Sequence, residues 1–150
     1  RPGYLHEIAG RNLRMANLVA AFGVAQLERT PELVAKRQAV ITAYEAAFEM
    51  LPLQRQTVQP SATKAPWLAV FRVSNRDGLL AHLRNLRIDA RAVWPSLTRQ
   101  PFLATWPSSA PVAEALARQC IWLPTFADMT ETQVQRVVDG VSSYYKGRRG

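Results

Sequence analysis

The chain has 150 residues, 48% of them hydrophobic and 20% charged, a composition typical of one soluble globular domain, or a large piece of one, and not of a disordered chain. Nineteen Lys and Arg against eleven Asp and Glu give a net charge of +8, which suits polyanions or phosphorylated small molecules. The single cysteine, Cys120, excludes an internal disulfide framework and fits a cytoplasmic location. No apolar run approaches the roughly 20 residues that span a bilayer, so no membrane segment is expected.

The basic residues are spread along the sequence, and only the final KGRRG forms a cluster. A nucleic-acid-binding protein would concentrate them in a stripe, so we expect no nucleic acid as partner. The first ten residues, RPGYLHEIAG, lack the apolar core of a signal peptide.

Two helices are predicted in the first third of the chain. Small and aliphatic residues dominate from Met15 to Leu27 on nearly every face, a pattern typical of a helix buried against something large. Thr30 as N-cap and Pro31 begin a long amphipathic helix, which Pro52 ends. Because the first helix is apolar all round, we expect it to pack on a surface outside this chain.

The rest of the chain alternates strands with helices. Residues 53–66 read as a connecting segment, and β-branched or alternating patterns predict strands at 67–73, 88–94 and about 120–124. Helices are expected after Asn75, from Pro111 to Gln119, and after Thr130, where Gln133 completes a capping box.

Few residues form a recognisable catalytic pattern. The chain has no glycine-rich phosphate loop and no Cys/His set with metal spacing, so no metal site is predicted. His82 is interpreted as an ordinary surface histidine and Cys120 as a small buried hydrophobe. For the four tryptophans, Trp67, Trp94, Trp106 and Trp122, packing is favoured over base stacking.

The segment GRNLRMANLVAAFGVAQLERTPELVAKRQAV (10–40) resembles the region after the cofactor lysine in the DegT/DnrJ/EryC1/StrS family of pyridoxal-phosphate (PLP) sugar aminotransferases. That family reads Gly-x-Asn-x-Arg-Met followed by a small-residue helix. The resemblance continues through RDGLLAHLRNLRIDARAVWP, RQPF, PVAEALARQCIWLPT and MTETQVQRVV, in order and at matching spacing.

The resemblance implies two site residues. Asn12 corresponds to the asparagine that reaches across the dimer interface to the phosphate of the partner's cofactor, and Arg14 to an arginine placed for an anionic group of the substrate. An amide and a guanidinium suit these ligands, since both donate hydrogen bonds to oxyanions. The alternative interpretation of this stretch is a solvated helix cap.

The resemblance also exposes what the chain lacks. The Schiff-base lysine and the acid that holds the pyridine nitrogen belong to a large domain, which would precede residue 1. None of Lys36, Lys64 and Lys146 has the sequence context of that lysine, so no catalytic residue is assigned. Around AVWPSLTRQP the family has histidines where Val93 and Thr98 stand, so no substrate-binding role is assigned to these two positions.

We therefore expect an α+β fold, the C-terminal small domain of a fold-type I aminotransferase, with a small, mainly antiparallel sheet and helices on one face. Residues 1–30 would be the interface segment and apolar helix, and residues 31–150 the small domain. The implied function is part of a PLP enzyme that aminates a keto-sugar nucleotide from an amino-acid donor, inactive alone. The expected partners are a second copy or a large-domain chain. The alternative is a non-catalytic orphan domain that binds a partner protein through the apolar helix.

Overall fold

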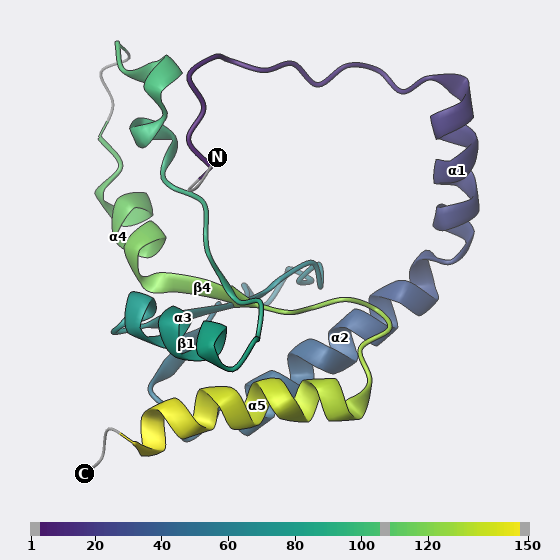
Figure 1. Cartoon of the computed structure of the whole chain (residues 1–150). Coiled ribbons are helices and arrows are strands. Elements are labelled where there is room, and N and C mark those ends of the chain that lie inside the picture. Colours follow the sequence, from purple (N-terminus) through teal and green to yellow (C-terminus); the bar gives the residue numbers. More distant parts are fainter. Residues whose placement is uncertain (1–3, 106–108, 148–150) are drawn as a thin grey trace.

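The computed structural model describes residues 4–105 and 109–147 and contains one antiparallel sheet, helices, and an N-terminal arm (residues 4–28) that arches out from the rest of the molecule and returns to it at α2 (Figure 1). In chain order the elements are α1 (Asn17–Glu28), α2 (Thr30–Ala47), β1 (Leu53–Arg55), β2 (Ala69–Val73), α3 (Arg76–Asn85), β3 (Arg91–Ala92), two 3₁₀ turns (Leu97–Arg99 and Pro101–Leu103), α4 (Pro111–Gln119), β4 (Cys120–Leu123) and α5 (Glu131–Lys146). The strands lie in the order β1-β2-β4-β3, and every neighbouring pair is antiparallel. The expected α+β fold is confirmed.

One face of the sheet carries the core. The register places Phe71 of β2 opposite Ile121 of β4, and Ala69 opposite Leu123. Because side chains alternate along a strand, these four share a face, and all four are buried. Helices α2, α3 and α5 supply the apolar side chains packed with them, chiefly Val40, Ile41, Tyr44, Leu79, Leu83, Val137 and Val141. The other face of the two strands is more open, since Val70 and Trp122 are only half-buried and Arg72 is exposed.

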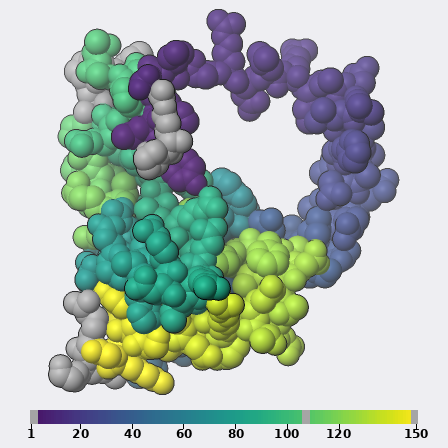
Figure 2. Space-filling model, viewed as in Figure 1, coloured from purple at the N-terminus to yellow at the C-terminus, as the bar shows by residue number. Residues whose placement is uncertain are grey.

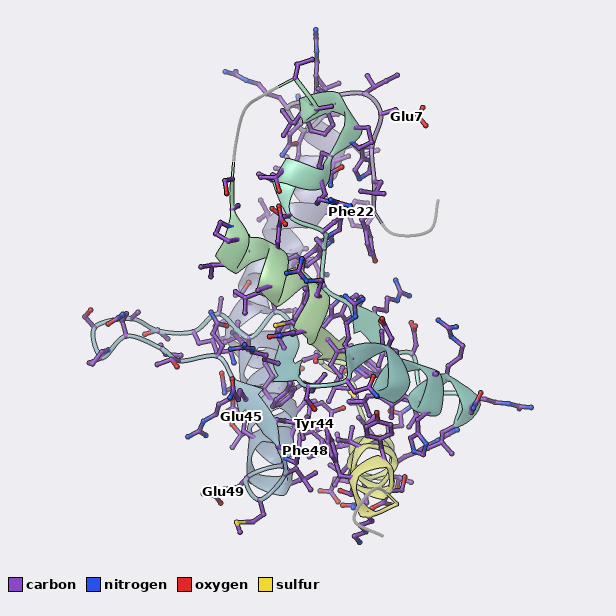
Figure 3. All side chains as sticks on the ribbon, turned by 90° about the vertical axis from the view of Figure 1, so that its left-hand side faces the viewer. Glu7, Phe22, Tyr44, Glu45, Phe48 and Glu49 are labelled. Carbon is purple, nitrogen blue, oxygen red and sulfur yellow. The ribbon has the colours of Figure 1, made fainter. Side chains whose placement is uncertain are left out.

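Aromatic side chains fix α2 on the sheet. Tyr44 stacks on Phe48 with ring centroids 5.8 Å apart, and Phe48 meets Phe71 of β2 edge-on at 5.4 Å. In Figure 3 Tyr44 of α2 and Phe48, the residue after α2, point into the core, whereas Glu45 and Glu49 point away from it. Burial raises the pKa of Tyr44, so its hydroxyl stays protonated.

Two predicted helix starts are confirmed. Asn75 Oδ1 accepts a hydrogen bond from the backbone N–H of Gly78 at 3.0 Å. Thr130 and Gln133 form the expected capping box, with bonds of 3.2 and 2.9 Å in the two directions. The Asn75 cap and the Thr130–Gln133 capping box both satisfy backbone N–H groups that the start of a helix leaves without partners.

The N-terminal helices differ from their predicted bounds. Thr30 is not an N-cap, because α2 follows α1 after the single residue Arg29, and the Thr30 hydroxyl donates back to the Gln26 carbonyl at 3.2 Å. Helix α2 ends at Ala47, before Pro52 is reached.

The strands also differ from prediction. Leu53–Arg55 is a strand where a connecting segment was expected, and it pairs with β2 through Leu53 opposite Val73. The strand predicted at 88–94 contains only Arg91–Ala92. The other two strands, Ala69–Val73 and Cys120–Leu123, are shorter than expected by one or two residues at one end.

Helix α1 forms as predicted but is not covered by the residues that the structure describes. It contains no buried residue, and Leu18, Phe22 and Leu27 are 75%, 72% and 69% exposed. Figure 2 shows open space between the N-terminal arm, including α1, and the rest of the molecule. The described residues therefore do not supply the burial expected for this helix.

Gly140→Ala is expected to lower the free energy of unfolding by about 1 kcal/mol. Gly140 lies where α5 packs on α3, and an added Cβ would stand 2.7 Å from Ile88 Cδ1 and 3.1 Å from Leu83 Cδ2. Overpacking of this kind lowers stability by about 1–3 kcal/mol. This loss exceeds the roughly 0.5–1 kcal/mol of stability that alanine adds over glycine inside a helix. Thermal melts should show a midpoint lower by about 2–4 °C.

Gly147→Ala is the matched control at the end of the same helix. Its added Cβ would lie 3.5 Å from the Ser143 carbonyl oxygen, an ordinary contact, so the midpoint should hardly move. An unchanged or higher midpoint for Gly140→Ala would contradict this packing.

Candidate functional site

The residues assigned by resemblance lie in an extended segment. Residues 4–16 contain no helix or strand, and both Asn12 and Arg14 are exposed. Among the described residues neither side chain has a hydrogen-bond or ion-pair partner. Helix α1 begins at Asn17 after the N-cap Ala16, which makes no side-chain capping bond. Asn12 lies four residues before that cap, so it does not cap α1 itself, and its exposure is compatible both with an external ligand and with a solvated segment.

The beginning of this segment is tied to the body of the domain by Gln100. This side chain is only 6% exposed, and its Nε2 donates to the Tyr4 carbonyl at 3.1 Å. Its Oε1 accepts from the His6 backbone N–H at 3.0 Å. Both polar ends of a buried amide are thereby satisfied, and the segment is fixed beside the loop that contains Gln100.

A cleft of about 1020 Å³ opens between the chain's first described residues, α3, β3 and α4. Charged side chains line much of it: six arginines (Arg76, Arg84, Arg87, Arg91, Arg99 and Arg118) and two carboxylates (Asp89 and Glu114). The arginines are scattered in the sequence but gathered here in space. Neither Asn12 nor Arg14 lines this cleft.

Three of the arginines have partners of their own. Arg91 Nη2 donates to Asp89 Oδ2 at 2.7 Å and lies over the Trp122 ring, 5.3 Å from its centroid. The Arg91 guanidinium holds the pKa of Asp89 below its usual value. Arg76 donates to the Ala117 carbonyl near the end of α4, where carbonyls lack helical partners. Arg118 lies 3.9 Å from Glu114, which also accepts a bond from Thr98.

The other three arginines are free to meet a ligand. Within the part of the chain that the structure describes, Arg84, Arg87 and Arg99 make no ion pair and no side-chain hydrogen bond. All three are exposed. The sequence offered no signal for this cleft, because its walls come from segments far apart in the chain.

The lysines lie away from this cleft. Lys36 Nζ lies 2.6 Å from Glu32 and 3.3 Å from Asp128, and the bond to Glu32 is the main reason that its pKa is raised. Lys64 lies 3.3 Å from Glu45. Lys146 is exposed at the last position of α5. None of the three lines the arginine cleft.

The remaining candidates have structural roles. His82 Nε2 lies 3.1 Å from the Gly140 carbonyl oxygen and 3.0 Å from Ser143 Oγ, joining α3 to α5. Cys120 is buried as predicted, and burial raises the pKa of its thiol. No group of three or more metal-ligating side chains occurs among the residues described. No described helix is long and apolar enough to cross a membrane.

Two of the tryptophans lie at the surface. Trp67 and Trp94 are 62% and 42% exposed and stack on each other with ring centroids 5.5 Å apart. Tyr4 meets Trp94 edge-on at 6.3 Å, so the row of rings extends to the cleft. Trp106 lies outside the described residues.

The sequence profile of the DegT/DnrJ/EryC1/StrS aminotransferase family matches residues 1–142. The chain belongs to this family. Its members are PLP-dependent enzymes, and the resemblance found in the sequence is confirmed.

Individual relatives agree with the family assignment. The chain is 32% identical over 143 residues to the GDP-perosamine synthase of Caulobacter vibrioides, covering 90% of this chain and 38% of that protein. It is 30% identical over 145 residues to EpsN of Bacillus subtilis, described as a pyridoxal phosphate-dependent aminotransferase, covering 91% and 37%.

A solved structure shares the fold. DesV of S. venezuelae, crystallised with a ketimine intermediate, superposes with a TM-score of 0.80 at 28% identity, covering 96% of this chain and 40% of DesV. The fold is thus that of the small-domain region of these aminotransferases. The chain spans about two fifths of the length of the proteins it matches.

Proposed function

We propose that this chain is the C-terminal part of a cytoplasmic, PLP-dependent aminotransferase that transfers an amino group from an amino acid to a keto-sugar nucleotide. The family match over residues 1–142 is the observation that carries the proposal. The relative named as a GDP-perosamine synthase supports the sugar-nucleotide class of substrate.

Asn12 is proposed to donate a hydrogen bond to the cofactor phosphate of a partner subunit, and Arg14 to bind an anionic group of the substrate. Both side chains are exposed and have no partner among the described residues, as expected of groups whose ligands come from outside. An amide N–H and a guanidinium are good donors to oxyanions. Bound pyridoxal phosphate would supply the electron sink of the reaction.

The residues present fit one edge of a PLP site and not its covalent centre. A lysine forms a Schiff base only as the free amine, and the carboxylates beside Lys36 keep it protonated. Lys64 is paired with Glu45. We therefore propose that the Schiff-base lysine comes from a large domain outside these residues. Residues 1–30 would connect to that large domain, and residues 31–150 would form the small domain of the enzyme.

The 150-residue chain purified alone is expected to show no transaminase activity when PLP is added. The physical reason is that the residues proposed here hold the cofactor phosphate and the substrate but cannot hold the cofactor covalently. The assay is glutamate-dependent conversion of a keto-sugar nucleotide, with the full-length Caulobacter enzyme as positive control. Turnover by this chain alone would refute the assignment of its lysines as bystanders.

A second candidate is a non-catalytic domain that binds a partner protein through α1. The exposed apolar side chains of α1 are as compatible with binding a partner protein as with forming an interface between enzyme subunits. The two differ in their response to the cofactor. An aminotransferase assembly binds pyridoxal phosphate with a contribution from Asn12, whereas the complex of an orphan domain is indifferent to it.

A further inference from the structure

We propose, building on the roles of Asn12 and Arg14 in the proposed function, that Gln100 is a positioning residue for both. Its side chain holds the beginning of the segment that contains them, so that their side chains are presented to the cofactor and the substrate. The two bonds that carry this role are those to the Tyr4 carbonyl at 3.1 Å and from the His6 backbone N–H at 3.0 Å.

Gln100 is itself held rigidly. It lies at the junction of the two 3₁₀ turns, where its backbone N–H donates to the Leu97 carbonyl at 3.0 Å and its carbonyl accepts from the Leu103 N–H at 2.9 Å. Its side chain is buried, and both polar ends of the amide are bonded. A side chain with every polar group satisfied in a buried position is a fixed support for whatever it binds.

The two bonds fix the direction of the segment as well as its position. The Tyr4 carbonyl and the His6 N–H lie on either side of Leu5, and one amide meets both, with its N–H as donor and its oxygen as acceptor. A residue of a neighbouring strand would pair with an extended chain in a similar way. An apolar side chain of the same size could make neither bond.

The backbone of Tyr4 shows that the start of the segment is held against its local preference. Tyr4 has φ of 54°, and the only other non-glycine residue of positive φ in the described ranges is Arg87, with φ of 56°, where the chain turns after α3. This conformation is unfavourable for a residue with a Cβ, and it persists where surrounding contacts determine it. The bond from Gln100 and the edge-on contact of the Tyr4 ring with Trp94 are such contacts.

Asn12 and Arg14 lie between two points of attachment. Residues 7–16 contain no helix or strand, and α1 begins at Asn17. In Figure 1 the N-terminal arm arches out from the domain between these two attachments. An irregular segment fixed at both ends has far fewer conformations than one fixed at a single end. Loss of the Gln100 bonds should therefore release Asn12 and Arg14 together.

The first test follows amide hydrogen exchange in the 150-residue chain by NMR. Gln100→Leu should speed exchange of the His6 N–H about tenfold or more, the effect of losing about 1.4 kcal/mol of protection. The Gly78 N–H, which the Asn75 side chain holds at 3.0 Å, should keep its rate. Gln100→Asn, whose amide is one methylene too short to reach both groups, should give the same result if Gln100→Leu does not fold.

The second test uses the complex of this chain with a large-domain polypeptide. Gln100→Leu should weaken PLP binding about tenfold and raise KM for the sugar nucleotide by a similar factor, or about 1.4 kcal/mol in each. Asn12→Ala and Arg14→Ala should each change only one of these two quantities. The double variant Asn12→Ala with Gln100→Leu should bind PLP no more weakly than Asn12→Ala alone, because Gln100 acts on the cofactor only through Asn12.

Thr125→Val is the matched control for a purely structural role. Thr125 is also buried and also joins a donor to an acceptor, since its hydroxyl accepts from the Ala69 N–H at 3.2 Å and donates to the Leu123 carbonyl at 2.9 Å. These bonds lie at the ends of β2 and β4 and do not touch the segment. This variant should lower the thermal midpoint and leave His6 exchange, PLP affinity and KM unchanged.

The outcomes separate this role of Gln100 from the proposed function. If Asn12→Ala weakens PLP binding and Gln100→Leu does not, the positioning role is overturned and the proposed function stands. If neither variant weakens it, the role of this segment in cofactor binding is overturned as well. Unchanged His6 exchange, equal acceleration at Gly78, additive losses in the double variant, or equal losses of PLP affinity in Thr125→Val would also overturn the positioning role.

Discussion

A double substitution of α1, Leu18→Glu with Phe22→Glu, is expected to convert an associated form of this chain into a monomer. Both side chains are about three quarters exposed. Burying each of them in an interface would contribute about 1.5–3 kcal/mol to the free energy of association. Losing both, and placing carboxylates there instead, should raise the dissociation constant by about a thousandfold or more. Light scattering at micromolar concentration measures the change in mass.

The matched control is Ala39→Glu with Ala43→Glu on α2. These two positions are four residues apart, as Leu18 and Phe22 are, and the substitutions add the same charge. They lie on the exposed side of α2, whose other face packs in the core. This variant should keep the mass of the unaltered chain. A monomeric unaltered chain with no dye-binding apolar surface, or a doubly charged α1 that still associates, would contradict the proposed interface.

Asn12→Ala is expected to weaken PLP binding by roughly 10- to 150-fold in a complex of this chain with a large-domain polypeptide. The lost bond runs from an amide to a charged phosphate, and such bonds contribute about 1.5–3 kcal/mol, at 1.4 kcal/mol per decade. Stability should not change, because Asn12 is exposed, lies outside α1 and caps nothing. Titration of pyridoxal phosphate into the complex is the measurement.

Arg14→Ala serves as the neighbouring comparison. It should leave cofactor affinity nearly unchanged and raise KM for the sugar nucleotide, since its proposed ligand is the substrate. Unchanged cofactor affinity in Asn12→Ala would remove this residue from the cofactor site.

The parts of the fold that could be predicted are those fixed by local chemistry. The capping box of Thr130 and Gln133 and the Asn75 cap each depend on residues three apart, so the sequence contains everything that determines them. The central strands β2 and β4 were also found, because buried strands consist of continuous apolar and β-branched residues. The burial of Cys120 followed from the same apolar run.

The parts that could not be predicted depend on contacts between distant segments. Strand β1 is three residues long with no alternation, and only its pairing with β2 makes it a strand. The strand expected at 88–94 lies at a sheet edge, where partners exist on one side only, and shrinks to Arg91–Ala92.

The candidate site divides in the same way. Asn12 and Arg14 could be named because a contiguous motif contains them. The arginine cleft could not, because α3, β3, α4 and the loop between them bring its side chains together only in the folded chain. The left-handed conformation of Arg87 is likewise invisible in a sequence, since arginine is not the residue that such a turn normally selects.

The most direct test of the central claim is to locate the lysine that binds the cofactor. The cofactor-bound protein, purified from its natural source, would be reduced with borohydride to trap the Schiff base, digested, and mapped by mass spectrometry. The proposed function predicts the reduced cofactor on a lysine outside these 150 residues. Recovery of the cofactor on Lys36, Lys64 or Lys146 would contradict it.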